Sequence, residues 1–221
     1  MDAWLTNVDW TEIGYAGLDT LLMLGGALLF SVLLGLPLGV LLFLTSRGQV
    51  LEHRVAYGLL SFAVNVLRSL PFIILLIVMI PLTVRLVGTS LGVAGAIPPL
   101  VAGTAPFFAR LVETAVRGVD RGVVEASQAM GATTAQIVLR VLLPEARAGI
   151  LAGITVTAVA LVSYTAMAGV VGAGGLGDLA MRFGYQRFQT DVMVVTVLML
   201  LALVQAIQML GDALVARASH R

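Results

Sequence analysis

The side chains that most often perform catalysis are scarce in this sequence of 221 residues. It has no cysteine, which excludes disulfides, iron–sulfur clusters and thiolate-bound zinc. The two histidines, His53 and His220, lie far apart near charged flanks, so a histidine metal centre is not expected. A membrane-embedded enzyme would need a nucleophile, an acid or a metal cluster, and only scattered serines and threonines are present. We therefore expect no catalytic residue, metal or cofactor on this chain.

One glycine-rich stretch, Gly172 to Gly177, fits the G-x-G-x-x-G pattern of dinucleotide-binding sites. That pattern works only between a strand and a helix, whereas this copy follows a long apolar segment. We expect its glycines, notably Gly174, Gly175 and Gly177, to let the chain leave a membrane span. A short amphipathic segment at 178–188 follows, with aromatic residues and the cations Arg182 and Arg187.

The composition indicates an integral membrane protein. Hydrophobic residues make up 59% of the chain, charged residues only 11%, and the mean hydropathy is +1.03. Thirteen basic residues nearly balance twelve acidic ones, and a net charge of +1 gives no reason to expect nucleic-acid binding.

Five segments are long and apolar enough to span a bilayer, whose core of about 30 Å needs roughly 20 helical residues. The alternation of barrel strands is absent. The predicted fold class is therefore an all-α polytopic membrane protein, one domain over 1–221, with five transmembrane helices near 18–43, 60–82, 92–114, 149–171 and 192–214.

The arginines between these spans predict the topology, because cytoplasmic loops are rich in basic residues. The segments on one side of the membrane hold only three arginines, Arg85, Arg182 and Arg187. The segments on the other side hold eight: Arg47, Arg54, Arg117, Arg121, Arg140, Arg147, Arg217 and Arg221. We therefore expect the N-terminus to lie outside, and the C-terminus and the loop between spans three and four to lie in the cytoplasm.

Few charges lie inside the predicted spans. The predicted spans hold three carboxylates, Asp19, Glu113 and Asp212, all near span ends and none in the middle. Glu113 lies near a cytoplasmic end, where it and Arg110 predict a local ion pair. Proton relays normally use buried Asp, Glu or His, so a self-sufficient secondary transporter or channel fits poorly, and energy for transport would enter through a partner. An arginine inside a span, such as Arg68, costs roughly 2.5–3.5 kcal/mol. Pro71 can kink the helix and free backbone carbonyls that could bind the Arg68 guanidinium; alternatively, Arg68 could line a transport pathway.

Two further groups of residues in the spans, pairs of glycines and a set on the fourth span, can be explained either by packing or by function. Gly35 with Gly39, and Gly149 with Gly153, have GxxxG spacing, for which internal helix packing is favoured over a dimer seam. In the fourth span, Ser163, Tyr164 and Met167 are the pathway candidates, with core packing as the default for a lone methionine.

The predicted cytoplasmic loop reads as two short helices. Asp120 caps a first helix through Met130, Gly131 breaks it, and Thr133 or Thr134 caps a second helix that ends before Pro144. This pattern is consistent with a hairpin that packs on its own helix bundle, and equally with a protruding hairpin that binds another protein.

The same loop resembles the EAA motif of ABC-importer permeases. That motif is E-A-A, three residues, G, nine residues, I, one residue and L-P, and this chain has Ser127 and Val141 at two of its positions. The resemblance implies that the loop docks on a separate ATP-hydrolysing subunit, and that ATP and magnesium belong to that partner. The implied coupling residues are Glu125, Ala126, Ser127, Gly131, Ala132, Val141, Leu143 and Pro144.

Over nearly its whole length the chain is most similar to the methionine-importer permease subfamily. The matching stretches begin at Gly35, Arg68, Ala105, Tyr164 and Gly172. The resemblance implies a bacterial inner-membrane homodimer with two ATPase copies and an extracytoplasmic substrate-binding protein. Another amino acid or small solute is the alternative substrate. The implied pathway or gate residues are Arg68, Ser69, Pro71, Phe72, Ser163, Tyr164 and Met167, and the outer-face candidates are Gly174, Gly175, Gly177 and Arg182.

Overall fold

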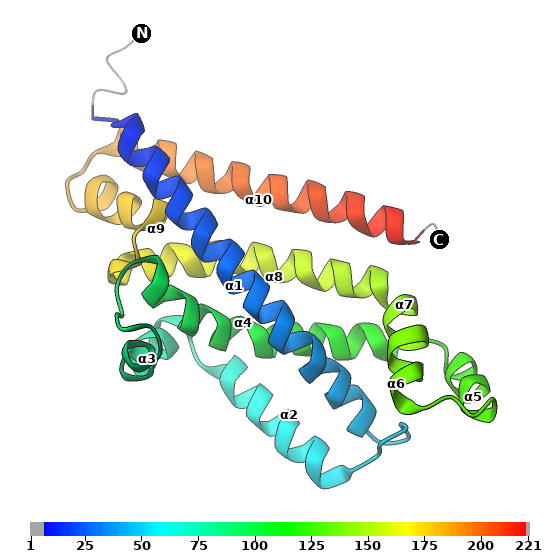
Figure 1. Cartoon of the computed structure of the whole chain (residues 1–221). Helices are drawn as coiled ribbons and strands as arrows, with labels where there is room; N and C mark the ends of the chain where they lie inside the picture. The colour runs from blue at the N-terminus through cyan, green and yellow to red at the C-terminus, as the bar shows by residue number, and fades with distance from the viewer. Residues whose placement is uncertain (1–6, 220–221) are drawn as a thin grey trace.

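The computed structural model describes residues 7–219, and this part of the chain is helical, with no strand. Four segments are long and apolar enough to cross a membrane: α1 (Trp10–Thr45), α4 (Gly92–Arg117), α8 (Arg147–Ala168) with its extension η3 (Gly169–Ala173), and α10 (Thr190–Ser219). A bent pair, α2 (Arg54–Ser69) and α3 (Phe72–Val87), counts as a fifth if its halves form one span. The all-helical prediction is confirmed (Figure 1).

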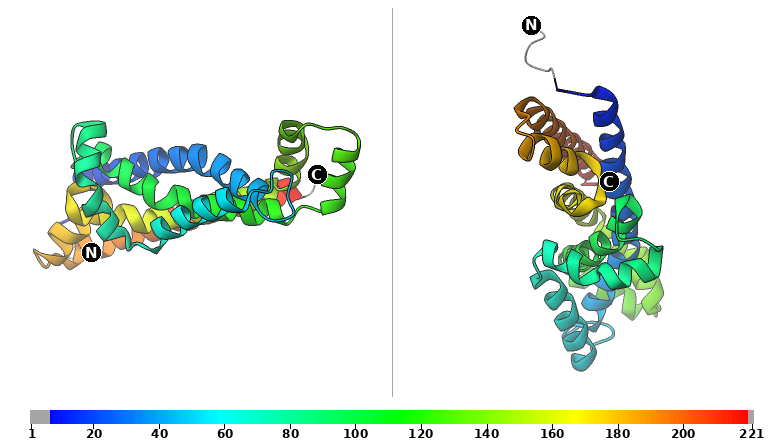
Figure 2. Two further views of the ribbon diagram at one scale, coloured as in Figure 1. Left: turned by 90° about the horizontal axis from the view of Figure 1, so that it is seen from below. Right: turned by 90° about the vertical axis from the view of Figure 1, so that its left-hand side faces the viewer.

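The segment at 60–82, predicted as one span in which Pro71 can kink the helix, is divided into two helices. The chain turns by 109° between α2 and α3, so that α3 runs across the other long helices (Figure 2). Leu70 is extended, with φ −78° and ψ 129°, and Pro71 caps α3. Proline disfavours the helical conformation in the residue before it and has no N–H to donate, so it ends one helix and starts another. We call this break, at Leu70 and Pro71, the elbow.

The first helix starts earlier than the predicted 18–43. Asp9 caps α1 by accepting hydrogen bonds from the backbone N–H groups of Thr11 at 2.8 Å and Glu12 at 3.2 Å. A carboxylate in the first turn is favourable for a helix, so Glu12 extends α1 rather than ending it.

The two glycine pairs pack against α4 of the same chain. A Cβ added to Gly35 would lie 2.7 Å from the carbonyl oxygen of Ala105, and one added to Gly149 would lie 2.8 Å from the Cβ of Ala115. The hydroxyls of Ser31 on α1 and Thr104 on α4 are 2.6 Å apart and buried. The interpretation as internal packing is confirmed, and α4 is the central helix between α1 and α8.

The loop after α4 forms the two short helical segments that we predicted, α5 (Arg121–Ala129) and α6 (Thr134–Ile137). Asp120 caps α5, Thr133 caps α6 in a capping box with Gln136, and Gly131 turns the chain with φ +81°. The second segment does not end before Pro144, as predicted, but continues through η2 (Val138–Leu142) and α7 (Leu143–Glu145). Pro144 is the second residue of α7 and directly follows the wider turns of η2.

Two short helical segments, α9 (Gly175–Leu179) and η4 (Ala180–Tyr185), lie at the opposite end of the molecule from α5–α7, beside the start of α1 (Figure 1). Gly172, Gly174 and Gly175 have φ between 80° and 93°, which lets the chain fold back after η3. The backbone N–H of Leu176 donates to the hydroxyl of Thr20 at 2.9 Å, which fastens α9 to α1.

Candidate functional site

The α5–α7 hairpin has one face on its own bundle and one face exposed. Val124, Ile137 and Leu142 are buried and pack with residues of α1 and α4. Val123 and Met130 of the α5 segment are 43% and 81% exposed, and Leu139, which is 65% exposed, lines an open apolar groove against α1. Exposed apolar residues on a structured hairpin at one end of the bundle are typical of a surface that another protein covers.

The eight coupling residues divide between these faces. Glu125, Ala126, Gly131 and Pro144 are exposed, whereas Ser127 is buried and donates its hydroxyl to the carbonyl of Val123 at 2.8 Å. The other three, Ala132, Val141 and Leu143, are half-buried. No atom lies within 4 Å of a Cβ added to Gly131, so its positive φ, and not crowding within this chain, explains the glycine.

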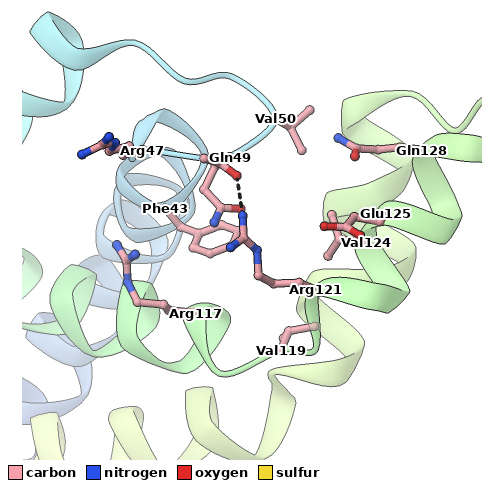
Figure 3. A pocket seen from close by; sticks show the side chains of 11 residues that line it. Phe43, Arg47, Gln49, Val50, Arg117, Val119, Arg121, Val124, Glu125 and Gln128 are labelled. Carbon is pink, nitrogen blue, oxygen red and sulfur yellow. Dashed lines mark hydrogen bonds between the residues drawn. The ribbon is translucent and has the colours of Figure 1, made fainter.

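A cationic cavity of about 470 Å³ lies between α5 and the end of α1 (Figure 3). It is lined by three arginines, Arg47, Arg117 and Arg121, together with Glu125 and Gln128. The guanidinium of Arg121 donates to the carbonyl of Gly48 at 3.2 Å, which ties the start of α5 to the loop after α1. Sequence reasoning missed this cavity because its walls come from three separate segments, and only the arginine bias of the loops indicated positive charge there.

The candidate pathway residues gather around the elbow. Phe72, the first residue of α3, stacks on Tyr164 of α8 with ring centroids 4.6 Å apart. Ser163 and Met167 are exposed on α8, so the default expectation of core packing is wrong for Met167, which is 47% exposed.

Arg68 is exposed on α2, and its guanidinium lies 5.8 Å from the centroid of the Phe107 ring. The interaction with carbonyls freed by Pro71 that we considered is not observed. Instead Ser69 donates its hydroxyl to the carbonyl of Asn65 at 2.8 Å. Asn65, Arg68 and Ser69 thus form an exposed polar strip on the last turns of α2.

The predicted ion pair between Arg110 and Glu113 is present, with Nη1 and Oε2 2.6 Å apart. Glu113 also pairs with Arg117, at 2.8 Å, and is itself only 5% exposed. The pair therefore belongs to a larger cluster of charged groups than the sequence spacing indicated, with Glu113 buried at its centre.

Of the outer-face candidates, Arg182 lies on a compact surface with charged and aromatic neighbours. Arg182 pairs with Asp178 at 2.7 Å and lies 3.6 Å from Glu12 of α1. The hydrogen bond that Arg182 donates to the Asp178 carboxylate raises the pKa of Arg182 above its ordinary value, although partial burial opposes the shift. Arg182 and Arg187 both lie near the Phe183 ring, and Phe188 is 86% exposed. Of the candidate glycines, Gly175 and Gly177 are buried and Gly174 is half-buried, so they pack this segment and do not themselves present a surface.

Comparisons with known proteins agree with this arrangement. The chain is 50% identical over 203 residues to a probable D-methionine transport system permease protein MetI of Vibrio cholerae, covering 92% of this chain and 90% of that one. It is 46% identical over 211 residues to the methionine import system permease protein MetP of Bacillus subtilis, covering 96% and 95%.

A solved structure, described as inward-facing conformations of the MetNI methionine ABC transporter, is also similar. It superposes with a TM-score of 0.93 at 44% identity, covering 96% of this chain and 99% of that one. A model of the family described as binding-protein-dependent transport system inner membrane component matches residues 32–220. The chain belongs to this family of binding-protein-dependent transport permeases.

Proposed function

We propose that this chain is the permease subunit of an ATP-driven importer of methionine, in its L form, its D form or both. The observation that carries the proposal is the match along nearly the whole chain to a methionine ABC transporter at a TM-score of 0.93 and 44% identity. The curated relatives, whose names specify methionine, support the same substrate. Another amino acid or small solute is the second candidate, because selectivity in a binding-protein-dependent system rests partly on the binding protein.

The orientation that we propose puts the α5–α7 hairpin and the end of α10 in the cytoplasm and the start of α1 outside. The arginine bias of the loops supports this topology. Arg47, Arg117, Arg121 and Arg147 all lie at the hairpin end of the bundle, next to the ends of α1 and α4 and the start of α8. The membrane is then the bacterial inner membrane, as the family description implies.

A second copy of this chain would cover the elbow and the polar strip. An interrupted helix such as the one at the elbow is tolerated at membrane depth only where protein or a water-filled cavity covers the break. The exposed Asn65, Arg68 and Ser69 are equally unsuited to lipid. We therefore infer that this face lines the pathway of a homodimer, with Phe72, Ser163, Tyr164 and Met167 near its gate.

The partners divide between the two ends of the molecule. Two copies of an ATPase that holds ATP and magnesium would dock on the exposed side of the hairpin, at Glu125, Ala126, Gly131 and Pro144. An extracytoplasmic binding protein would dock on the surface around Arg182. In this proposal ATP binding closes the ATPase pair, the hairpins follow it, and the pathway alternates between inward and outward access.

The test is to purify the chain with the ATPase of its operon and to measure methionine uptake by proteoliposomes that also contain the binding protein. We expect Gly131→Glu to lose the ATPase on purification and to abolish uptake, because a long charged side chain obstructs docking. Gly88→Glu is the matched control, since Gly88 also has φ +81° and open space but lies between α3 and α4, away from the hairpin.

Equal loss in both variants would trace the effect to backbone strain and contradict docking at Gly131. Uptake without ATP would refute the ABC mechanism and favour a secondary transporter. Uptake of another solute in preference to methionine would overturn the substrate alone.

A further inference from the structure

A cluster of hydrogen-bonded polar side chains joins α2 to α4, and we call it the clasp. Arg110 of α4 donates to the Ser61 hydroxyl at 2.5 Å, to the Ser61 carbonyl at 3.2 Å and to Asn65 Oδ1 at 3.0 Å. Glu113 of α4 accepts from the hydroxyl of Tyr57 at 3.3 Å. Arg117 completes the clasp through its ion pair with Glu113.

Glu113 is the centre of the clasp. Its side chain is only 6% exposed and lies between two guanidinium groups, with Arg110 on one oxygen and Arg117 and Tyr57 on the other. Burying a carboxylate is costly unless charges and hydrogen bonds compensate it, and here both oxygens are occupied. The network is therefore intolerant of losing Glu113, because Arg110 would remain half-buried without its anionic partner.

The apolar packing of α2 is confined to one small cluster, against which Tyr57 and Leu60 are half-buried. Val64 is its only buried residue, in a small cluster with Leu42 of α1 and Ala109 of α4. Val55, Leu59 and Phe62 are 65%, 66% and 69% exposed. The clasp is thus the main polar connection that fixes the position of α2 on α4.

The clasp lies between the two regions that an importer must connect. Glu113 is one turn from the end of α4 at Arg117, and Asp120, which caps α5, follows three residues later. At its other end, α2 leads into the elbow and to Phe72, which stacks on Tyr164. Asn65 belongs both to the clasp and to the exposed polar strip.

We propose that Glu113 is a positioning residue that holds α2 on α4, so that a displacement of the coupling hairpin reaches the elbow. This inference deepens the proposed function and rests on it. Glu113 touches neither substrate nor ATPase in this proposal. It acts by making the last turns of α4 and the whole of α2 move together.

The test measures ATP hydrolysed for each methionine taken up in proteoliposomes containing the whole complex. For Glu113→Gln we expect normal recovery of the ATPase, retained hydrolysis, and an increase in this ratio of about fivefold or more, the lower end of typical coupling effects. Asp212→Asn is the matched control, because it neutralises an exposed carboxylate on α10 without touching the clasp. A proportional fall of hydrolysis and uptake, or no change in either, would overturn the proposal.

A second variant covers the case in which Glu113→Gln does not assemble. Tyr57→Phe combined with Ser61→Ala and Asn65→Ala removes the three α2 side-chain contacts of the clasp and leaves only the Ser61 carbonyl on Arg110. Glu113 stays paired with both arginines, so assembly should survive. We expect the same rise in ATP used per methionine, and an unchanged ratio in an assembled complex would refute the clasp. If the unmodified complex shows no ATP-dependent uptake, the proposed function has failed, and this result is distinguishable from failure of the clasp alone.

Discussion

The ring of Phe72 lies flat on the ring of Tyr164, with centroids 4.6 Å apart and planes 8° from parallel. Phe72 is the first residue after the elbow, so this contact fixes the direction in which α3 leaves it. An aromatic pair contributes about 0.5–1.5 kcal/mol beyond its buried area. A connection of that strength can hold one orientation of α3 and still be broken during transport.

We expect Tyr164→Ala to slow methionine uptake more than Tyr164→Phe. The alanine variant loses the stacking partner of Phe72, whereas the phenylalanine variant keeps the ring and loses only the hydroxyl. Initial uptake rates at equal amounts of assembled complex measure the difference. Equal impairment of the two variants would assign the role of Tyr164 to its hydroxyl and not to stacking.

Gly35→Ala should destabilise the protein by about 1–3 kcal/mol, as overpacking usually does. Its new Cβ would meet the carbonyl oxygen of Ala105, which belongs to the α4 backbone and cannot rotate away. Gly25→Ala is the control in the same helix, because no atom lies within 4 Å of its added Cβ. Thermal unfolding in detergent compares the two, and a Gly35→Ala variant as stable as the control would contradict close packing of α1 on α4.

The hydroxyls of Ser31 and Thr104 should contribute about 0.6–2 kcal/mol, the range measured for hydrogen bonds between membrane helices. Thr104 already donates to the carbonyl of Leu100 at 2.7 Å, so Ser31 is the donor across the helices. We expect Ser31→Ala to lower stability by this amount. Once Thr104 is changed to Val, the same serine substitution should have no effect, and a full effect there would exclude this bond as the cause.

Arg182→Gln separates anchoring from docking at the outer face. The ion pairs of Arg182 are about half exposed, so their loss should change stability by less than about 1 kcal/mol. If the surface receives the binding protein, uptake at low binding-protein concentration should fall, and saturating binding protein should restore it. A variant that is destabilised but indifferent to binding-protein concentration would indicate simple anchoring.

Local signals in the sequence predicted the hairpin well. Asp120, Gly131 and Thr133 each affect only the backbone within one turn of themselves, and each has the role that its residue type indicated. For the elbow, Pro71 indicated a kink but not a break of 109°, because hydropathy is continuous across Pro71 and a proline in an apolar segment can either kink a helix or divide it. Only tertiary contacts, here the stack of Phe72 on a helix far along the chain, distinguish these outcomes.

The sequence predicted only the part of the clasp that lies within α4, because its other contacts are tertiary. Arg110 and Glu113 are one turn apart and visible from spacing alone. Their partners Tyr57, Ser61 and Asn65 lie 45–56 residues earlier, where no periodicity relates them to α4. The GxxxG pairs likewise indicated close contact without specifying which helix makes it.

The close fit of α1 and α4 has a consequence for the order of synthesis. Chains are made at about 5–20 residues per second, so α1 leaves the ribosome several seconds before α4, which ends roughly 70 residues later. Of the four long helices α1 has the most apolar window, and α4 has the least apolar one and three prolines. The apolar α1 can therefore remain in lipid without a partner. By the time α4, the least apolar of the long helices, is synthesised, α1 is already present for it to pack against.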